Sequence, residues 1–264
     1  MLMENTRKLE NDCVVRCDHI GKIFGEFETS HEVVKDINLN IKENEFVVIF
    51  GPGQCGKTTL LNLMAGLEQT TSGEVNVNGK PVTAPGPERG MVYQTTALFP
   101  WLTVMGNVEF GLKMAGVKKS KRRERAQYYI DLVGLKGFEK SYPVKLSGGM
   151  CQRVGIARAY CNDPSVILID EPFGHLDAQT RYLMEEEIER ICSTEKRTVV
   201  FVTNNIEEAV YLADRIILFS KKPASVKHVF DLNGVGRPRD NMSEEFLKIR
   251  QEVADMMDLD LGGE

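Results

Sequence analysis

Four short runs along the chain are apolar at nearly every position, where a half-exposed strand would alternate between apolar and polar residues. They cover residues 46–50, 166–169, 199–202 and 215–219. A strand that is buried on both faces gives this continuous pattern, and such strands are typical of parallel sheets covered on both sides. Stretches with helical character separate the four runs. The pattern therefore predicts the α/β fold class.

The first 80 residues follow a different pattern. Residues 33–41 and 74–77 alternate between apolar and polar positions, and Asn-Gly and Gly-Lys-Pro turn sequences lie close to them. Alternation next to such turns is typical of antiparallel strands. We therefore expect an antiparallel β layer beside the parallel core.

The segment after Asp177 has a clear helical period. Its apolar residues recur at i, i+4, i+7 and i+8, which is one face of an α-helix; they are Met184, Ile188, Ile191 and Cys192. The other face carries Glu185, Glu186, Glu187 and Glu189. The segment is predicted to be an amphipathic helix with an acidic face opposite its apolar face.

The middle of the chain, about residues 95–160, is rich in helical pattern and poor in strand signals. A helical insert within one α/β domain is the simplest architecture that fits this pattern. The insert contains a basic run, made of Lys118, Lys119, Lys121, Arg122, Arg123 and Arg125. Such a run serves either as an anion or membrane-surface patch or as a solvated helix face or helix start. A run this short in an acidic protein favours the solvated helix.

Composition narrows the class of protein. Lys plus Arg total 33 and Asp plus Glu total 38, so the formal net charge is −5, which argues against a nucleic-acid-coating protein. The chain is 42% hydrophobic and 27% charged, as a globular protein is. No apolar run approaches the roughly 18–20 residues of a membrane helix, because Asp214 and Arg215 interrupt the best candidate, residues 209–219. Residues 1–10 are polar and charged, without a secretory hydrophobic region. We expect a soluble, cytosolic chain.

The cysteines give no sign of a metal or disulfide framework. The six are scattered and form no CxxC pair. By spacing alone Cys13 and Cys17 could be two metal ligands, but no second pair of ligands lies nearby in the sequence. Ordinary reduced thiols are the favoured interpretation.

A phosphate-binding loop follows the first apolar run. The sequence from Gly51 to Thr58 fits G-x-x-x-x-G-K-[ST], with a strand before it and a helix-like run after it, which is the context that the motif requires. Its backbone N–H groups would surround the phosphates, Lys57 would add a positive charge, and the Thr58 hydroxyl suits Mg²⁺. The candidate nucleotide-binding residues here are Gly51, Pro52, Gly53, Gln54, Cys55, Gly56, Lys57, Thr58 and Thr59.

Two acidic residues end the second apolar run. Asp170 would hold the Mg²⁺ shell, and Glu171 would orient or deprotonate the attacking water. Two adjacent carboxylates at the end of a buried strand are costly without a cation, which favours a functional role over a packing role. With the loop, they indicate a site that binds ATP or GTP.

Between these motifs the chain reads Leu146-Ser-Gly-Gly-Met-Cys-Gln-Arg153. Here it resembles the nucleotide-binding subunits of ATP-binding-cassette (ABC) transporters, and the order of motifs matches that family over nearly the whole chain. The resemblance implies a P-loop NTPase parallel-sheet core with an antiparallel β layer and a helical subdomain insert. It implies one cassette over residues 1–264, divided as follows: an ATPase core at about 1–94 and 161–240, a helical subdomain at about 95–160, and a C-terminal helical tail at 241–264.

The resemblance also implies a mechanism. Two cassettes, either two copies or a pair of related ones, would face head to tail and trap ATP and Mg²⁺ between one phosphate loop and the partner's Ser147, Gly148 and Gly149. Gln94 would touch the Mg²⁺ and the attacking water, and Asp177 would link the two nucleotide sites. Phe24 aligns with the aromatic residue that stacks on adenine, although a core phenylalanine is nearly as good an interpretation.

Local similarity narrows the family further. Residues 85–94 and 98–104, together with Gly236-Arg-Pro-Arg239, are similar to the importers of nitrate, aliphatic sulfonates and taurine. That branch implies an integral-membrane permease, a periplasmic or extracellular solute-binding protein acting indirectly, no nucleic-acid partner, and a peripheral position on the cytoplasmic face of the plasma membrane. Trp101 would lie where the permease docks a short helix, or in the core of the helical subdomain, and both could hold.

Four positions depart from the family pattern. Asn204 stands where the family has a histidine, and Asn205 where it has an aspartate. An amide cannot titrate as an imidazole does, and losing one transition-state contact typically lowers the rate by about 10²–10³. Gln54 replaces a glycine, which strains the backbone if that position has a positive φ. His175 replaces a small residue and could substitute for the missing histidine, although a surface histidine without a role is favoured.

These departures keep two alternatives open. The first is a weakly hydrolytic or regulatory cassette, paired with a catalytically intact partner. The second is a non-transport cassette of the translation-factor or DNA-repair type, although such proteins usually show tandem cassettes or a long coiled-coil insert. Co-purification with a permease would separate a transport subunit from the second alternative.

Overall fold

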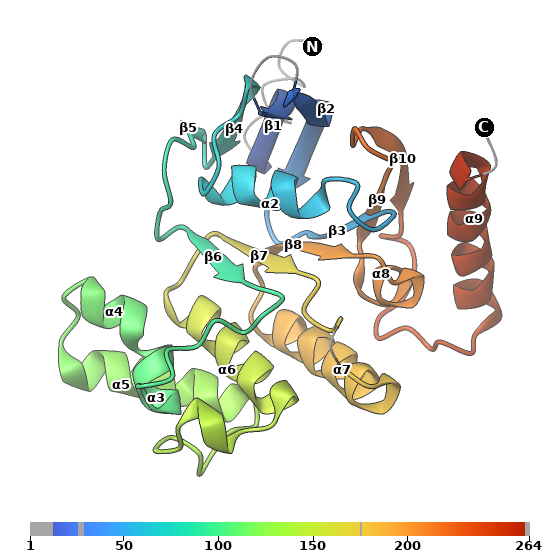
Figure 1. Ribbon diagram of the computed structural model, residues 1–264. Coiled ribbons are helices and arrows are strands. Elements are labelled where there is room, and N and C mark those ends of the chain that lie inside the picture. The colour runs from blue at the N-terminus through green and yellow to red at the C-terminus, as the bar shows by residue number, and fades with distance from the viewer. Residues whose placement is uncertain (1–12, 26–28, 175, 262–264) are drawn as a thin grey trace, which may run out of the picture. The chain divides into compact units, whose positions relative to one another are not determined.

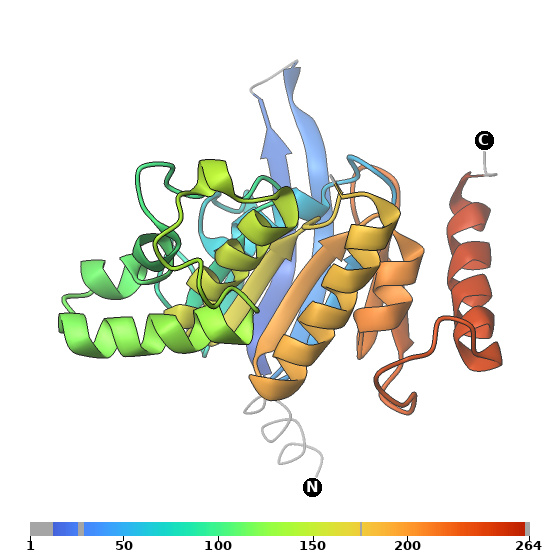
Figure 2. The ribbon, with the colours of Figure 1, turned by 90° about the horizontal axis from the view of Figure 1, so that it is seen from below.

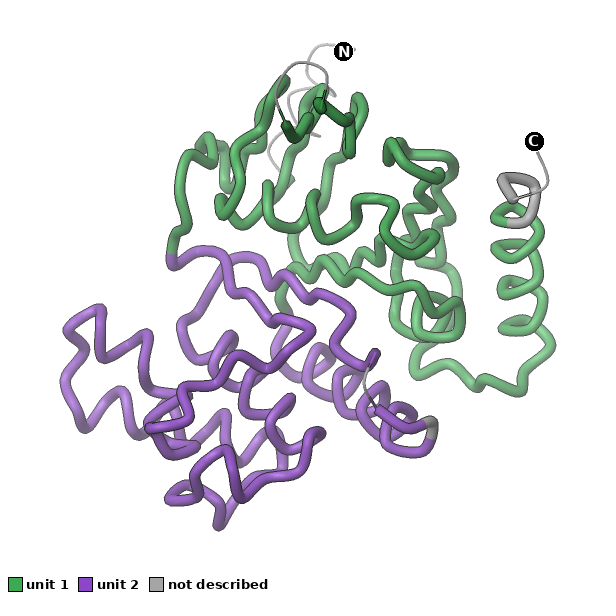
Figure 3. The backbone as a smooth tube through the Cα atoms, in the orientation of Figure 1, with its two compact units in different colours: residues 1–86, 197–264 green, residues 87–196 purple. Residues whose placement is uncertain are grey.

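The computed structural model describes residues 13–25, 29–174 and 176–261. The chain forms two compact units, coloured separately in Figure 3: unit 1 holds residues 1–86 and 197–264, and unit 2 holds residues 87–196. His175 lies outside the described residues. The functional division of the cassette at residues 94/95 and 160/161 remains a prediction.

Unit 1 contains the expected antiparallel layer. Its strand order is β2-β1-β4-β5, with β1 at Cys13–Phe24, β2 at His31–Lys42, β4 at Ser72–Val77 and β5 at Lys80–Pro81. Each neighbouring pair is antiparallel. The sequence pattern located β2 and β4 but missed β1, because polar residues interrupt its apolar positions and irregular register shifts break its alternation.

Unit 1 also contains a set of mainly parallel strands. β3 (Phe46–Phe50) pairs in parallel with β8 (Thr198–Thr203) and β9 (Arg215–Phe219), and β10 (Val226–Asp231) pairs antiparallel with β9. Every residue of β3 and β8 is buried. The continuous apolar runs therefore predicted the buried parallel strands correctly.

Three helices complete unit 1. α2 (Lys57–Ala65) contacts β2, β4 and β8, so it lies between the antiparallel layer and the parallel strands. α8 (Ile206–Leu212) packs on β3 and β8, and α9 (Glu244–Leu261) packs on α8 (Figure 1). This packing fixes α2 directly after the buried strand β3, which positions the loop between them.

Unit 2 pairs β6 (Arg89–Val92) in parallel with β7 (Val166–Asp170). Its helices appear together in Figure 2; they are α3 (Val104–Val108), α4 (Phe110–Met114), α5 (Lys119–Leu132), α6 (Gly148–Cys161) and α7 (Ala178–Thr194), with a 3₁₀ turn η2 at Pro143–Lys145. α6 is the central helix of this group, since it contacts α3, α4, α5 and β6. The helical insert between strands is as the sequence predicted.

Helix α7 departs from its predicted acidic face. Met184, Ile188 and Ile191 are buried as expected, but Glu185 and Glu189 are buried too, at 5% and 6% exposure. Residues at i+1 lie about 100° around a helix, so the buried face is wider than the apolar stripe and includes these two carboxylates. The acidic face that stays in solvent is correspondingly narrower than predicted.

Candidate active site

The phosphate loop in unit 1 is shaped by close backbone contacts. A Cβ atom at Gly51 would lie 3.1 Å from the Cβ of Phe219, and one at Gly56 would lie 2.8 Å from the carbonyl oxygen of Val33. Gly56 also has φ +124°, which side chains rarely adopt. A Cβ at Gly53 would meet nothing within 4 Å. Gly56 is therefore required by the fold, Gly51 is tightly packed, and Gly53 is not constrained by its neighbours.

Gln54 has the backbone conformation that the family pattern placed in question. Its φ is +61°, in the left-handed region where a non-glycine residue is strained. The expectation of strain at this position is therefore supported by the structure. The strained residue lies between Pro52, whose carbonyl accepts a hydrogen bond from Lys57, and Lys57 itself.

Lys57 is 3% exposed, and its ammonium donates hydrogen bonds to the carbonyl oxygens of Gly51 (3.0 Å) and Pro52 (2.8 Å). The loop's own carbonyl groups thus hold the Lys57 ammonium in place. No side chain caps α2, and its first turn carries no acidic residue. The uncapped N–H groups and the positive end of the helix dipole leave this helix start suited to an anion.

The segment after β8 carries Asn204 and Asn205. The Asn205 side chain caps α8, since its Oδ1 accepts from the backbone N–H groups of Glu207 (2.8 Å) and Glu208 (3.4 Å). Thr203 Oγ1 donates to the buried carboxylate of Glu208 at 2.6 Å. Asn204 is exposed, and no residue in the described part of the chain pairs with its amide. Asn205 therefore builds the turn, while Asn204 leaves its amide open to solvent.

Phe24 ends β1 and is half-buried. Its ring stacks on that of His31, with centroids 6.1 Å apart, and the Lys22 ammonium lies 4.6 Å from the ring centroid. Phe24 is therefore not a core phenylalanine. A partly exposed aromatic ring is available for stacking on a planar ligand.

In unit 2, β7 delivers the two carboxylates. Asp170 is the last residue of the buried strand and is 6% exposed. Glu171 follows it with φ +37°, so the chain turns sharply at this residue. Both residues take part in interactions within the protein.

Within unit 2, two pairs of segments that are distant in the sequence lie close together. A Cβ atom at Gly174 would lie 3.4 Å from Nε2 of Gln94, and one at Gly149 would lie 3.4 Å from Cγ2 of Thr180. The exposed Gln94 thus approaches the loop after Glu171. The start of α6 likewise lies beside the start of α7. Spacing along the sequence did not reveal either proximity.

Ser147 and Asp177 are both N-caps. The Ser147 hydroxyl accepts from the backbone N–H of Met150 at 3.3 Å. Asp177 Oδ1 accepts from the backbone N–H of Thr180 at 2.9 Å, and its Oδ2 accepts from the Thr180 hydroxyl at 2.7 Å. These two bonds hold the pKa of Asp177 below its ordinary value. Both residues therefore have a local structural role in addition to any role at a nucleotide.

Similarity to known proteins shows the family of this chain. A family model described as ABC transporter matches residues 34–174. The chain is 46% identical, over 92% of its own length and 91% of the relative's, to an uncharacterized ABC transporter ATP-binding protein of Methanocaldococcus jannaschii. This chain belongs to the ABC transporter family. It is the ATP-binding cassette of such a transporter.

Other relatives of the cassette agree. It is 41% identical to the aliphatic sulfonates import ATP-binding protein of Bacillus cereus, over 90% of the chain and 94% of that protein. It is also similar to the solved ATP-binding cassette MJ0796 in a dimeric post-hydrolysis state bound to ADP and Pi. That match has a TM-score of 0.72 and 33% identity, and covers 83% of this chain and 98% of that one. The predicted family and fold are confirmed.

The cassette's residues fit magnesium and a nucleotide by their chemistry. The uncapped start of α2 and the Lys57 ammonium suit phosphate oxygens, and the Thr58 hydroxyl and the Asp170 carboxylate are oxygen ligands of the kind Mg²⁺ prefers. Among the residues that the structure describes, no cluster of three or more His, Cys, Asp or Glu side chains could hold a metal ion. A cation that takes most of its other ligands from substrate phosphates and water needs no such cluster.

The remaining candidates are corrected or unchanged. Trp101 is 70% exposed, so the interpretation of this residue as part of a subdomain core is wrong. Cys17 is buried and Cys13 is half-buried, both as free thiols, and burial raises both of their pKa values. None of the helices in the described part of the chain combines the length and apolar character needed to cross a bilayer.

Proposed function

We propose that this cassette hydrolyses ATP to drive an importer of a small oxyanion or similar solute, such as a sulfonate, nitrate or taurine. The observation that carries the proposal is the phosphate loop, with a buried Lys57 bound by loop carbonyls and an uncapped α2 behind it. The similarity to an aliphatic sulfonates import protein supports the choice of solute class. The cassette would act as a peripheral subunit on the cytoplasmic face of the plasma membrane.

In the proposed reaction, the loop binds the phosphates of ATP and Lys57 neutralises part of their charge. Thr58, Gln94 and Asp170 would hold magnesium, which would supply positive charge to the phosphoryl oxygens. Glu171 orients the attacking water and accepts its proton. Phe24 stacks on the adenine, and a second cassette supplies Ser147, Gly148 and Gly149. Asp177 would connect the two sites.

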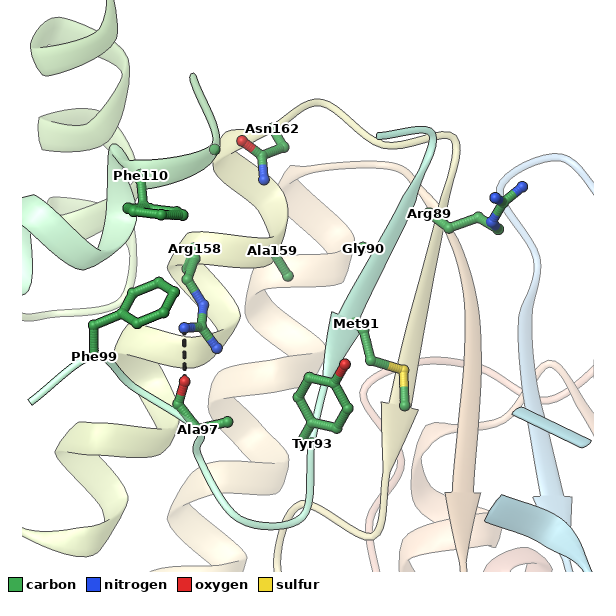
Figure 4. A pocket seen from close by; sticks show the side chains of 11 residues that line it. Arg89, Gly90, Met91, Tyr93, Ala97, Phe99, Phe110, Arg158, Ala159 and Asn162 are labelled. Carbon is green, nitrogen blue, oxygen red and sulfur yellow. Dashed lines mark hydrogen bonds between the residues drawn. The ribbon is translucent and has the colours of Figure 1, made fainter. Parts of the chain in front are cut away.

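The permease partner is supported by a pocket within unit 2 (Figure 4). The pocket has a volume of about 310 Å³, and its lining includes Phe99, Phe110 and Arg158. The ring centroids of Phe99 and Phe110 are 4.5 Å apart, and the exposed Trp101 ring lies 5.5 Å from Phe99. An aromatic patch of this kind suits a short helix of another protein.

Arg158 connects this pocket to the segment after Gln94. Its guanidinium donates to the carbonyl oxygens of Ala97 (2.9 Å) and Thr96 (3.3 Å) and lies 5.7 Å from the Phe99 ring centroid. Burial lowers its pKa. A permease helix bound in the pocket would contact the Arg158 guanidinium, which is bonded to Thr96 and Ala97. Binding of the permease could then shift the segment after Gln94 and change the position of the catalytic glutamine.

A weakly hydrolytic cassette is the second candidate function, and Asn204 is the observation that favours it. The residue occupies the histidine position, is exposed, and cannot accept and release a proton near neutral pH. In this alternative the cassette binds ATP normally, and a second cassette with an intact histidine performs most of the turnover.

Steady-state ATP hydrolysis of the purified chain, with Mg²⁺, tests the proposal and separates the two candidates. We expect the native chain to turn over, Glu171→Gln to lose at least about 100-fold in kcat, and Asn204→His to change kcat little. Glu186→Gln, an exposed glutamate on α7, is the matched control and should retain activity.

Each other outcome has a defined meaning. A native chain that binds ATP but is nearly inert, and that Asn204→His activates, would establish the weakly hydrolytic cassette. A native chain whose turnover survives Glu171→Gln would contradict the assigned role of that carboxylate. A chain that does not co-purify with a membrane permease would contradict the transport role.

A further inference from the structure

The turn between α4 and α5 carries an exposed cluster of lysines that the proposed reaction does not use. We call residues 113–121 the lysine turn; its cations are Lys113, Lys118, Lys119 and Lys121. All four side chains are exposed, and none has a carboxylate partner among residues 13–25, 29–174 and 176–261. Met114, beside them, is 62% exposed. The turn projects from the end of the α4–α5 hairpin in both Figure 1 and Figure 2.

Neighbouring arginines behave differently. Arg122 pairs with the carboxylate of Glu109 at 2.8 Å, and Arg125 pairs with that of Asp163 at 2.8 Å. The basic run therefore has two parts: arginines that pair with carboxylates elsewhere in unit 2, and lysines that have no carboxylate partner in the described part of the chain. The sequence alone did not separate the two.

Three of the four lysines do not stabilise the helix that they begin, whereas Lys113 lies in the last turn of α4, where a cation suits the helix dipole. Lys118 is the N-cap residue of α5, Lys119 and Lys121 lie in its first turn, and neither an acidic residue nor a side-chain cap is present there. Cations at this end of a helix oppose its dipole. Residues that destabilise their own helix are typical of a functional surface.

We propose that the lysine turn is a docking surface for the anionic headgroups of a lipid bilayer. The charge of the turn identifies the occupant, because four exposed cations within residues 113–121 complement an anionic surface, although the whole chain has a formal net charge of −5. Each lysine near an anionic membrane strengthens binding about fivefold, and the unbranched Met114 side chain can enter the interfacial layer beside them. The inference rests on the proposed function only in placing the cassette at a membrane.

Flotation of the full chain with lipid vesicles tests this proposal. The vesicles are pure phosphatidylcholine or contain about one third phosphatidylglycerol, at physiological salt. We expect binding to the anionic vesicles alone, weakening as salt rises. The variant Lys118→Gln, Lys119→Gln, Lys121→Gln should lower the partition coefficient roughly 100-fold, and Met114→Gln should lower it less.

The matched control removes the same charge elsewhere. Lys35, Lys80 and Lys248 are exposed lysines in unit 1, and changing all three to Gln should leave vesicle binding unchanged. Equal losses in the two triple variants, or no binding to anionic vesicles, would overturn the proposal. So would tighter lysine-dependent binding to a DNA or RNA oligonucleotide, which would assign the surface to nucleic acid.

ATP hydrolysis measured on the same preparations keeps the two proposals apart. A lysine-turn variant with full ATPase activity is folded, so its loss of vesicle binding supports the docking surface. Vesicle binding by a chain without ATPase activity would contradict the proposed function and leave the docking surface standing. ATP hydrolysis without any vesicle binding would overturn the docking surface and leave the proposed function standing.

Discussion

Gly53 and Gln54 are adjacent in the phosphate loop, but only Gln54 has a positive φ. Gln54 has φ +61°, whereas Gly53 has no positive φ and a Cβ atom added to it would meet nothing within 4 Å. The residue with the greatest conformational freedom is thus one position away from the place that requires it. A loop that tolerates this arrangement must be held by other contacts, and the bonds from Lys57 to two loop carbonyls supply them.

The glycines of the loop give a prediction at the residue scale. Gly56→Ala should destabilise the cassette by about 1–3 kcal/mol, because its Cβ would clash with a backbone carbonyl and its φ would be strained. Gly53→Ala should change stability by less than about 0.5 kcal/mol. Urea unfolding of both variants measures the difference, and similar midpoints for the two would contradict the account of the loop.

At the scale of single elements, three candidate site segments cap the helices that they begin. Ser147 caps α6, Asp177 caps α7 and Asn205 caps α8. A cap residue sits where the chain turns from loop to helix, with its side chain at the N–H end. The same geometry that satisfies the helix thus places a polar side chain at the start of each of these three helices.

Asp177 gives a prediction at this scale. Its pKa lies below the ordinary value because the backbone N–H and then the hydroxyl of Thr180 bond to the carboxylate. The carboxylate therefore stabilises the fold above the unfolded-state pKa, and this contribution is lost as the pH falls through the folded-state pKa. Asp177→Asn should accordingly lose less stability than the native chain between neutral pH and about pH 3.

Urea unfolding of the native chain and of Asp177→Asn, at neutral and acidic pH, measures this effect. The difference between the two proteins isolates Asp177 from the other carboxylates whose pKa values are also lowered, among them Asp36 and Glu139. Identical acid sensitivity in both proteins would show that the cap does not titrate with folding.

Prediction of the elements succeeded where burial is continuous. β3 and β9 were located at both ends, and β7 and β8 to within one residue. β10 was missed because it mixes half-buried and exposed positions without a regular period. A strand that packs on only part of one face leaves no periodic trace in the sequence.

For the whole molecule, the motifs divide between the two units. Unit 1 holds the phosphate loop and Asn204, and unit 2 holds Gln94, Ser147, Asp170, Glu171 and Asp177. A similar cassette has been solved as a dimer, so ATP-dependent dimerisation of this chain is the property to test at this scale.

We expect Glu171→Gln to form a dimer when ATP is added, since slow hydrolysis preserves the nucleotide that joins two cassettes. Gly149→Asp in that background should keep it monomeric, because the added carboxylate would repel the γ-phosphate. The space at Gly149 is adequate for a Cβ, with Thr180 Cγ2 at 3.4 Å. Sedimentation velocity measures both, and an ATP-driven dimer in the double variant would contradict the assigned role of this glycine.

The sequence by itself determined the family of the cassette, its candidate site residues and its buried strands. The phosphate loop, the Asp170-Glu171 pair and the Leu-Ser-Gly-Gly segment depend on residue types at fixed short spacings, and a fully buried strand is apolar at every position. These signals are local, so a linear pattern retains them.

Only the tertiary structure decided which surfaces these elements present. It buried Glu185 and Glu189, exposed Trp101, brought Gln94 to Gly174, and separated the paired arginines from the exposed lysines near α5. Each of these outcomes depends on a neighbour far away in the chain, because burial and pairing are properties of packed surfaces. The spacing of residues along one segment does not specify which distant side chain will cover it.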